Sequence, residues 1–220
     1  MLGVYVTVPI ACFRKGLARE YLETELLPPP ATCYGFLLSL VGETKRSQHV
    51  GCRIAPMLLN ETSQSVVLRT VWRVKKTPLG SPGNTRPDYQ QLLTGKTSQS
   101  PFIELLIWLD STDEPGLRLE DRVRIALDPK ARHQIERFGG LSLGESTHLV
   151  DEVSLFDGRV VDKLRSRDGR IFLKSERGRM TLPVWVDHVG SAKTRFVTGD
   201  LVKSGISQPP VESMPCISSE

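Results

Sequence analysis

The segment from residue 138 to residue 148 combines residue types that could bind a phosphate group. Three glycines fall within six positions there, and hydroxyl side chains lie beside them. Glycine lets backbone amides approach a ligand closely, and glycine-rich loops form concave amide nests that bind anions. The candidate ligand-contacting residues are Gly139, Gly140, Ser142, Gly144 and Ser146. By itself the segment could also be an ordinary glycine-rich turn between a helix and a strand.

His148 ends this segment and is the best single candidate for acid–base chemistry. Metal-free cleavage of a phosphodiester needs a base that activates the attacking hydroxyl, an acid for the leaving oxygen and a cation for the phosphate. A lone histidine in a loop of this kind more often serves as a hydrogen-bonding partner. The loop lacks the Gly-Lys-Ser/Thr ending of a Walker-type loop, so nucleotide hydrolysis is not expected.

Basic side chains are concentrated in three places. Two small groups are Arg14, Lys15 and Arg19 near the N-terminus, and Arg73, Lys75 and Lys76 further on. Residues 159–179 hold eight basic and three acidic side chains, so this segment carries +5 whereas the rest of the chain sums to −1. Such clusters attract phosphate and make binding depend on salt. Solvated surface is the alternative for each of them.

Several classes of site and location are disfavoured by the sequence. The four cysteines form no Cys-x-x-Cys pair, and no histidine stands at zinc-like spacing from two of them, so no metal, cofactor or disulfide framework is expected. No charged and apolar signal opens the chain, and no apolar run is long enough to span a bilayer. We therefore expect a cytoplasmic protein without a membrane partner.

The elements that must position these residues indicate an α+β fold. Alternating and helical apolar spacing predicts a strand at 3–9, a helix at 33–41, strands at 50–58, 65–75 and 102–109, a helix at 118–127 and a strand at 147–156. Apart from the strand at 65–75, which leads into the polar segment that follows it, this succession fits the ferredoxin-like βαββαβ pattern. Thr32 is expected to cap the first helix and Gly42 to end it. Tyr34 at the helix start could stack on a base or donate its hydroxyl, or it could be a packing residue.

The remaining segments are expected at the periphery. Residues 76–100 are rich in polar residues, Gly and Pro, and predict an extended loop or a protruding hairpin. Asp168-Gly169 lies between two alternating runs and predicts a hairpin turn, with short strands at 180–186 and 194–198. The predicted units are a domain at 1–156, a β-rich extension at 157–203 and a disordered tail at 204–220.

Two stretches taken together resemble the CRISPR-associated protein five family of the RAMP superfamily. Members open with a strand, a basic segment and a proline-rich approach to a helix that begins Thr/Ser-x-Tyr-Gly. Residues 13–30 and Thr32-Cys33-Tyr34-Gly35 match that succession. Members later carry a Leu-Gly-x-Ser loop, matched by Leu143-Gly144-Glu145-Ser146. The likeness covers residues 1–156, and the two signatures in this order are specific.

The resemblance implies a role in antiviral defence within a type I CRISPR surveillance complex, often called Cascade. Such a subunit binds the 5′ handle of the CRISPR RNA, and its thumb hairpin, here at about 76–100, contacts the adjacent backbone subunit. The large subunit, and target DNA through the complex, are further expected partners. The RNA-contacting residues would be Arg14, Lys15, Arg19, Thr32, Tyr34, Arg73, Lys75, Lys76, Gly139, Gly140, Ser142, Gly144, Ser146 and His148.

Some members of that family cut the precursor RNA with a tyrosine and an adjacent Lys-His pair. No Lys-His pair occurs here, and Arg132-His133 is the nearest imitation. Arginine could stabilise a phosphorane but is a poor proton donor. We therefore expect a non-catalytic RNA-binding subunit. The alternatives are a metal-independent endoribonuclease on the same fold and an interaction module without an RNA role.

Overall fold

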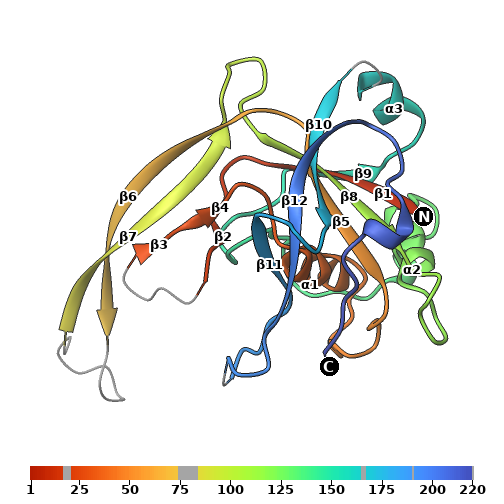
Figure 1. Ribbon diagram of the computed structural model, residues 1–220, viewed down its shortest axis with the longest axis horizontal. Helices are drawn as coiled ribbons and strands as arrows, with labels where there is room; N and C mark the ends of the chain where they lie inside the picture. The colour runs from red at the N-terminus through yellow and green to blue at the C-terminus, as the bar shows by residue number, and fades with distance from the viewer. Residues whose placement is uncertain (17–20, 74–83, 165–166, 190, 220) are drawn as a thin grey trace.

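The computed structural model describes residues 1–16, 21–73, 84–164, 167–189 and 191–219. The protein has an α+β fold dominated by β-sheet (Figure 1). One seven-stranded sheet holds the body together, with the strand order β11-β12-β10-β5-β8-β1-β9 and antiparallel neighbours throughout. Its strands are β1 (Leu2–Val8), β5 (Arg53–Leu58), β8 (Ile103–Asp110), β9 (Glu152–Leu155), β10 (Asp168–Lys174), β11 (Met180–Trp185) and β12 (Arg195–Gly205).

The centre of this sheet is strand β8, which is apolar along most of its length and buried at every residue. Continuous apolar strands of this kind are buried on both faces, and β8 lies between β1 and β5. Val4 pairs with Ile107, and Ala55 pairs with Trp108. The predicted strands at 3–9, 50–58 and 102–109 are confirmed within a few residues at their ends.

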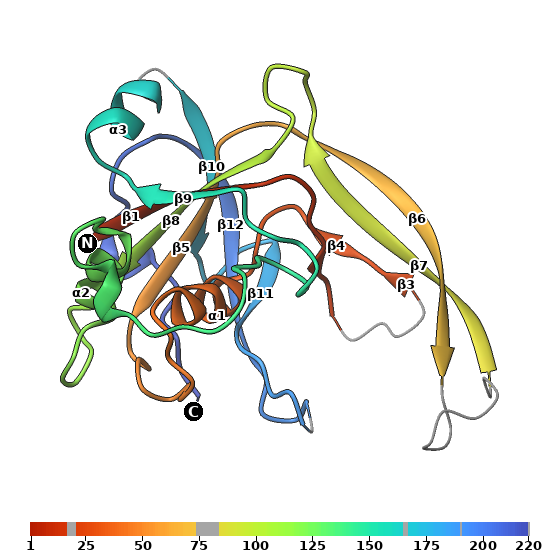
Figure 2. The ribbon, with the colours of Figure 1, turned by 180° about the vertical axis from the view of Figure 1, so that it is seen from behind.

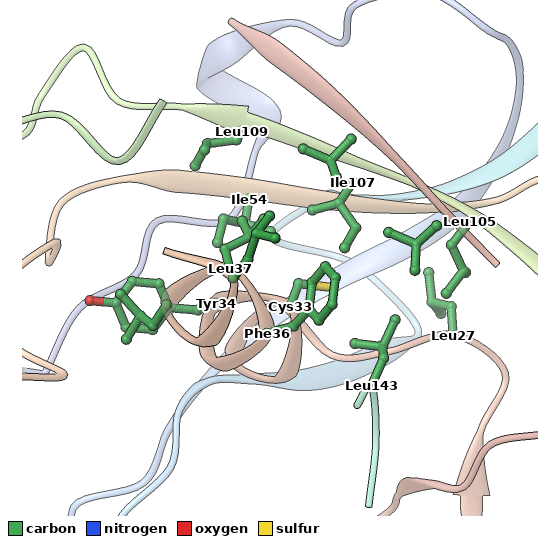
Figure 3. Close-up of a cluster of buried hydrophobic side chains, with 14 of the residues drawn as sticks. Leu27, Cys33, Tyr34, Phe36, Leu37, Ile54, Leu105, Ile107, Leu109 and Leu143 are labelled. Atoms are coloured by element: carbon green, nitrogen blue, oxygen red, sulfur yellow. The ribbon is translucent and has the colours of Figure 1, made fainter. Parts of the chain in front are cut away.

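Helix α1 (Pro30–Leu40) packs on one face of the sheet and supplies much of the main core. Figure 3 shows Cys33 and Leu37 of this helix among Ile54 of β5 and Ile107 of β8. Thr32 does not cap the helix, which is a correction: the N-cap is Pro29, and the fixed φ of Pro30 suits the first helical position.

Gly42 ends α1 as predicted, through a Schellman motif. The Gly42 amide donates to Ser39 and the Glu43 amide donates to Leu38, which satisfies the last carbonyls of the helix. Gly42 has a φ of +68°, and a Cβ there would lie 1.9 Å from the carbonyl oxygen of Glu136. Only glycine fits both requirements, so this residue also determines where the chain near 136 can pack.

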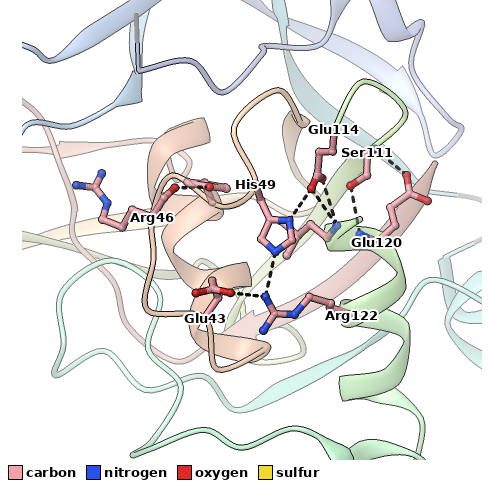
Figure 4. A network of polar contacts seen from close by, with 9 residues as sticks. Glu43, Arg46, His49, Ser111, Glu114, Glu120 and Arg122 are labelled. Atoms are coloured by element: carbon pink, nitrogen blue, oxygen red, sulfur yellow. Dashed lines mark hydrogen bonds and ion pairs between the residues drawn. The ribbon is translucent and has the colours of Figure 1, made fainter. Parts of the chain in front are cut away.

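Helix α2 (Leu119–Leu127) covers the same face through Leu119 and Val123 and confirms the predicted helix at 118–127. A buried polar network ties it to the loop after α1 (Figure 4). His49 Nδ1 contacts the Glu114 carboxylate at 2.5 Å, and Arg122 donates to His49 Nε2 at 3.0 Å. Because arginine has no acceptor, the proton of the neutral ring belongs on Nδ1. A short 3-10 turn, η1 (Arg132–Gln134), follows.

The opposite face of the sheet is covered by α3 (Gly158–Leu164) and the C-terminal segment, which form a second core with Tyr5 and Trp108. Two expectations are corrected here. Asp168-Gly169 is not a hairpin turn but the start of β10, which pairs with β12 and β5. The segment after residue 204, expected to be disordered, is packed: Met214 and Ile217 are fully buried, and the Ile54 amide donates to Pro215. It contains a 3-10 turn, η2 (Val211–Ser213).

A long hairpin projects from the body and is visible in both views (Figures 1 and 2). Its strands are β6 (Thr62–Arg73) and β7 (Asn84–Gly95), and β3 (Tyr21–Leu22) pairs with β7 in parallel. Strands β2 (Phe13–Arg14) and β4 (Thr24–Glu25) form a small ribbon at its base. Much of the segment 76–100 is thus strand β7, and residues 76–83 lie outside the described residues.

Candidate nucleic-acid interface

Four segments far apart in sequence meet where the hairpin leaves the body. They are residues 11–15, 21–25, 88–93 and 141–150, and together they are called the hairpin junction below. Two backbone hydrogen bonds between Ala11 and Leu93, of 3.0 and 2.8 Å, join the first of them to β7. The junction therefore unites the basic segment after β1 with the glycine-rich loop and with the base of the hairpin.

The glycine-rich loop is a tight, closed structure rather than an open strand connection. The Leu143 amide donates to the His148 carbonyl at 3.1 Å, and the Val150 amide donates to Leu141 at 2.9 Å. Leu143 is buried in the main core and anchors the loop. The predicted strand at 147–156 is accordingly shorter, because residues up to 150 belong to this loop and β9 begins at Glu152.

The glycines of this loop do different things. Gly144 has a φ of +101°, and a Cβ there would lie 2.8 Å from the Cys12 carbonyl oxygen. Gly139 also has a positive φ, of +78°, but nothing lies within 4 Å of a Cβ placed there. Gly139 and Gly140 are exposed, so their backbone is accessible to a ligand. Gly144, in contrast, allows the loop to pack closely against residue 12.

His148 is buried and acts as a connector between the loop and the basic segment. Its Nδ1 accepts hydrogen bonds from the backbone amides of Cys12, at 3.1 Å, and of Glu145, at 3.3 Å. A nitrogen that accepts two amide hydrogens carries no proton of its own, so the neutral ring has its proton on Nε2. In this geometry His148 is a hydrogen-bonding partner, which is one of the two roles considered for it from the sequence.

Two adjacent glutamines of β7 tie the hairpin to both of its neighbours. Gln90 donates to the Glu145 carboxylate of the loop at 2.9 Å. Gln91 accepts from the Thr24 amide at 3.0 Å and donates to the Tyr21 hydroxyl at 3.0 Å. Successive strand residues point to opposite faces, so the pair spans the sheet formed by β3, β7 and β6. Sequence reasoning missed this pair because a lone Gln-Gln carries no recognisable motif.

The basic residues of the prediction divide into three sets. Arg14 and Lys15 are exposed at the junction, where Phe13 separates them from Cys12, and the Lys15 amide donates to the Glu23 carbonyl. Burial raises the pKa of the nearby Glu25 carboxyl, and the charge of Lys15 opposes that rise. Arg73 is the last residue of β6, away from the junction, while Arg19, Lys75 and Lys76 lie outside the described residues.

Tyr34 does not belong to an exposed site, which is a correction. The side chain is 1% exposed, and its hydroxyl donates to the Arg46 carbonyl at 2.6 Å, so its ring cannot stack on a base in this arrangement. Burial is also the main reason that the pKa of this phenol is raised. Thr32 is half-buried in the first turn of α1. The packing alternative therefore holds for Tyr34.

The broad face of the main sheet is closed to RNA. Small RNA-binding sheets often stack bases on exposed aromatics, but Tyr5 and Trp108 are buried under α3, Phe156 and the C-terminal segment. Among the described residues, Phe196 of β12 is the exposed aromatic side chain of this sheet, and the other exposed aromatics lie outside it. Tyr21 and Tyr89 form an edge-on pair within the junction with ring centroids 6.2 Å apart, and Phe138 is fully exposed before the glycines.

Neither a metal centre nor a membrane helix is present in the described part of the chain. Within the residues that the structure describes, no group of three or more His, Cys, Asp or Glu side chains could hold a metal ion. No helix among them is both long and apolar enough to cross a bilayer. What the junction offers chemically is exposed backbone, hydroxyls and cations, which are groups that bind a phosphate backbone.

Comparisons with known proteins relate the chain to CRISPR-associated proteins. The chain is 46% identical over 222 residues to "CRISPR-associated protein Cas5" of Myxococcus xanthus (strain DK1622), covering 99% of this chain and 97% of that protein. A chain of a "CRISPR RNA-guided surveillance complex" has a similar fold, with a TM-score of 0.61 at 12% identity over 92% of this chain and 89% of that one. A "Cas protein" crystal structure gives a TM-score of 0.51 at 16% identity, over 98% and 97%. No family model matches.

Proposed function

The chain belongs to the CRISPR-associated protein Cas5 family, and from that membership we propose that it is the subunit of a type I CRISPR surveillance complex that holds the 5′ handle of the guide RNA. Its partners in this role are the CRISPR RNA, the adjacent backbone subunit and the large subunit, with target DNA reached through the complex. The role is structural, in antiviral defence, and requires no cofactor.

One observation carries the RNA-binding part of this proposal. The hydrogen bond from the Cys12 amide to His148 Nδ1 places the exposed cations at 14 and 15 next to the glycine-rich loop. Single-stranded RNA is bound by phosphate clamps, hydroxyl contacts and base stacking, and the junction offers groups for each. Lys15, Ser146 and Tyr21 are exposed there.

The strand order supports a ferredoxin-like unit at the centre of the sheet. Strands β1 and β5 are joined through α1 and have β8 between them, and β8 and β9 are joined through α2 and have β1 between them. Two such split βαβ units make up the βαββαβ pattern. The β6–β7 hairpin is inserted between the second and third strands of this unit, and we assign it as the thumb.

The proposal that the subunit does not cut RNA is supported by the environment of its histidines. His148 is buried with Nδ1 engaged by two backbone amides, and His49 is buried between Glu114 and Arg122. His133, which is exposed beside Arg132 on η1, and His188, which is exposed after β11, are the remaining candidates for a metal-independent endoribonuclease. Arg132 could stabilise charge on a phosphate but is a poor proton donor.

Fluorescence anisotropy with labelled handle RNA tests the binding role. We expect Arg14→Glu combined with Lys15→Glu to weaken binding by at least 10-fold, because two cations at the junction become anions, and to lower the slope of log K against log salt. Lys174→Glu with Lys203→Glu makes the same change in charge on exposed residues of β10 and β12 and should alter affinity less than 2-fold.

Two results would contradict the proposal. Equal losses in both double variants would show non-specific attraction rather than a site at the junction. Cleavage of labelled precursor RNA that persists in EDTA and is lost in His133→Ala, His148→Ala or His188→Ala, with each variant still folded by circular dichroism, would assign the endoribonuclease function instead.

A further inference from the structure

An open cleft of about 830 Å³ lies between helix α1 and the chain just before the glycine-rich loop. Its lining includes Leu38, Ser39, Arg46, Arg137, Phe138 and His188. The cleft has an apolar part from Leu38, Ile135 and Phe138, and around it lie hydroxyl, imidazole and guanidinium groups. None of these side chains takes part in the junction described above.

Phe138 is the most exposed large apolar side chain of the described residues, with the whole of its surface accessible to solvent. Its backbone is nevertheless held in place on both sides. The Arg137 guanidinium donates to the Gly139 carbonyl at 2.9 Å, and the Glu136 carbonyl packs against Gly42 at the end of α1. An aromatic ring on a fixed backbone pays little conformational entropy when it binds a flat ligand.

The cations of the cleft are arranged in advance as well. The Arg46 guanidinium lies over the Trp185 ring, 4.5 Å from its centroid, and donates to the Val186 carbonyl at 3.0 Å. Arg137, which also lines the cleft, is exposed, as is Lys45, the residue before Arg46 in the sequence. Of the carboxylates that line the cleft, Glu43 is held by Arg122 at 2.6 Å and Glu136 is exposed. The two arginines and two glutamates that line the cleft therefore balance in charge, and one of the glutamates is already paired with a cation outside the lining.

We propose that this cleft binds one unpaired nucleobase of the guide RNA, stacked on Phe138, with the flanking phosphates near Arg46 and Arg137. The inference rests on the proposed function and extends it to a second contact region. Stacking on an exposed aromatic next to cations is how single strands are bound without base pairing. Phe138 directly precedes Gly139, so a strand that contacts the loop backbone can reach the cleft.

A protein partner fits these surroundings less well. Protein interfaces bury contiguous apolar areas and are depleted in charge at their centre. The three apolar side chains of this cleft, Leu38, Ile135 and Phe138, lie among charged and hydroxyl groups. A nucleotide matches this mixture, because its base is flat and apolar on its faces while its edges and phosphates are polar.

Titration of single-stranded handle RNA carrying 2-aminopurine at successive positions tests the inference. Phe138→Ala should weaken binding about 10-fold, since one base–aromatic stack is lost. At one position of the RNA, the wild-type protein should quench the 2-aminopurine fluorescence, and the Phe138→Ala variant should not. Phe138→Trp should keep both affinity and quenching. Phe196→Ala, which removes a half-exposed aromatic from β12, should bind as wild type.

Each outcome decides between defined alternatives. Wild-type affinity and quenching in Phe138→Ala, with binding still lost in the Arg14→Glu and Lys15→Glu variant, would overturn the inference and leave the proposed function intact. Absence of RNA binding by the wild-type protein would overturn both. Normal RNA binding by Phe138→Ala with loss of assembly onto a partner subunit would identify the cleft as a protein-docking site and overturn the nucleobase assignment.

Discussion

Gly139 and Gly144 show how two residues of one motif can differ in role. Both have a positive φ, at which an L side chain is strained, but only Gly144 is packed against another part of the backbone. The close neighbour is the Cys12 carbonyl, in the segment whose amide bonds to His148. Gly144 thus maintains the contact between the loop and the basic residues, while Gly139 shapes the exposed part of the loop.

Alanine substitutions at these two positions separate the backbone effect from the contact. We expect Gly139→Ala to lower the free energy of unfolding by about 1 kcal/mol, from the strained φ alone. Gly144→Ala should lower it by about 2–3 kcal/mol, because the Cys12 carbonyl must also move. Urea denaturation of both variants measures the difference. Equal losses would show that the loop can shift away from residue 12 without cost.

At the scale of elements, the hairpin divides into a packed base and a projecting part. Leu92 and Leu93 of β7 are buried, and Gln90 and Asp88 are buried beside them. Directly opposite on β6, residues 65–68 are exposed, including Val66 and Leu68. A hairpin with its base in the body and exposed apolar side chains along one strand suits contact with a neighbouring subunit better than stabilisation of the monomer.

Shortening the hairpin tests this division. Replacing residues 70–87 with Asn-Gly joins Arg69 to Asp88, which are paired in the native register, through a two-residue turn. The body should keep its free energy of unfolding within about 1 kcal/mol, because the buried base remains. Assembly with the adjacent subunit and guide RNA, followed by size-exclusion chromatography, should be weakened. Unchanged assembly would contradict the assignment of the hairpin as the thumb.

At the scale of the whole molecule, the C-terminal part is continuous with the body. Strand β10 pairs with β5. Several hydrogen-bonded polar side chains also link the two parts on the opposite face of the sheet. Arg167 donates to Glu104 at 2.8 Å, and Tyr5 donates to the same carboxylate at 3.0 Å. Lys163 of α3 donates to the Tyr5 hydroxyl at 3.1 Å. We therefore expect residues 1–219 to unfold as one unit.

This link should make the stability depend on pH in the acid range. Burial alone would raise the pKa of Glu104, but hydrogen bonds from Arg167 and Ser100, with the charge of Arg167, lower it below its ordinary value of 4.5. The unfolded chain therefore takes up the proton first as the pH falls. The stabilisation from this carboxylate is complete above pH 4.5 and is lost as the pH falls through the lowered pKa.

Glu104→Gln should remove this pH-dependent contribution. Urea denaturation between pH 7 and pH 3 should show a variant that is less stable by about 2 kcal/mol at pH 7, because Arg167 loses its charged partner. Its stability should fall less steeply below pH 4.5 than that of the wild type. Parallel curves for the two proteins would mean that other carboxylates govern acid unfolding. Separate transitions for body and C-terminal part would contradict the single unit.

Much of the fold follows from local patterns in the sequence. The nearly continuous apolar run of β8, the alternation in β1 and the Gly42 stop of α1 are visible in the chain because each depends on neighbours within a few residues. The resemblance to the Cas5 family also came from short ordered signatures, and the full-length relative confirms it. Polar segments were harder: the run at 76–100 could be a loop or a hairpin, and β7 forms there because β6 pairs with it.

The sequence by itself determined the fold class, the family and the two chemical signatures, since these depend on residue type and short spacing. Tertiary structure decided which of those residues can meet a ligand. It buried Tyr34 in the core and His148 behind two backbone amides, and it left Arg14, Lys15 and Phe138 exposed. Burial and pairing depend on segments more than 100 residues apart, such as Cys12 and His148, and no local pattern records that distance.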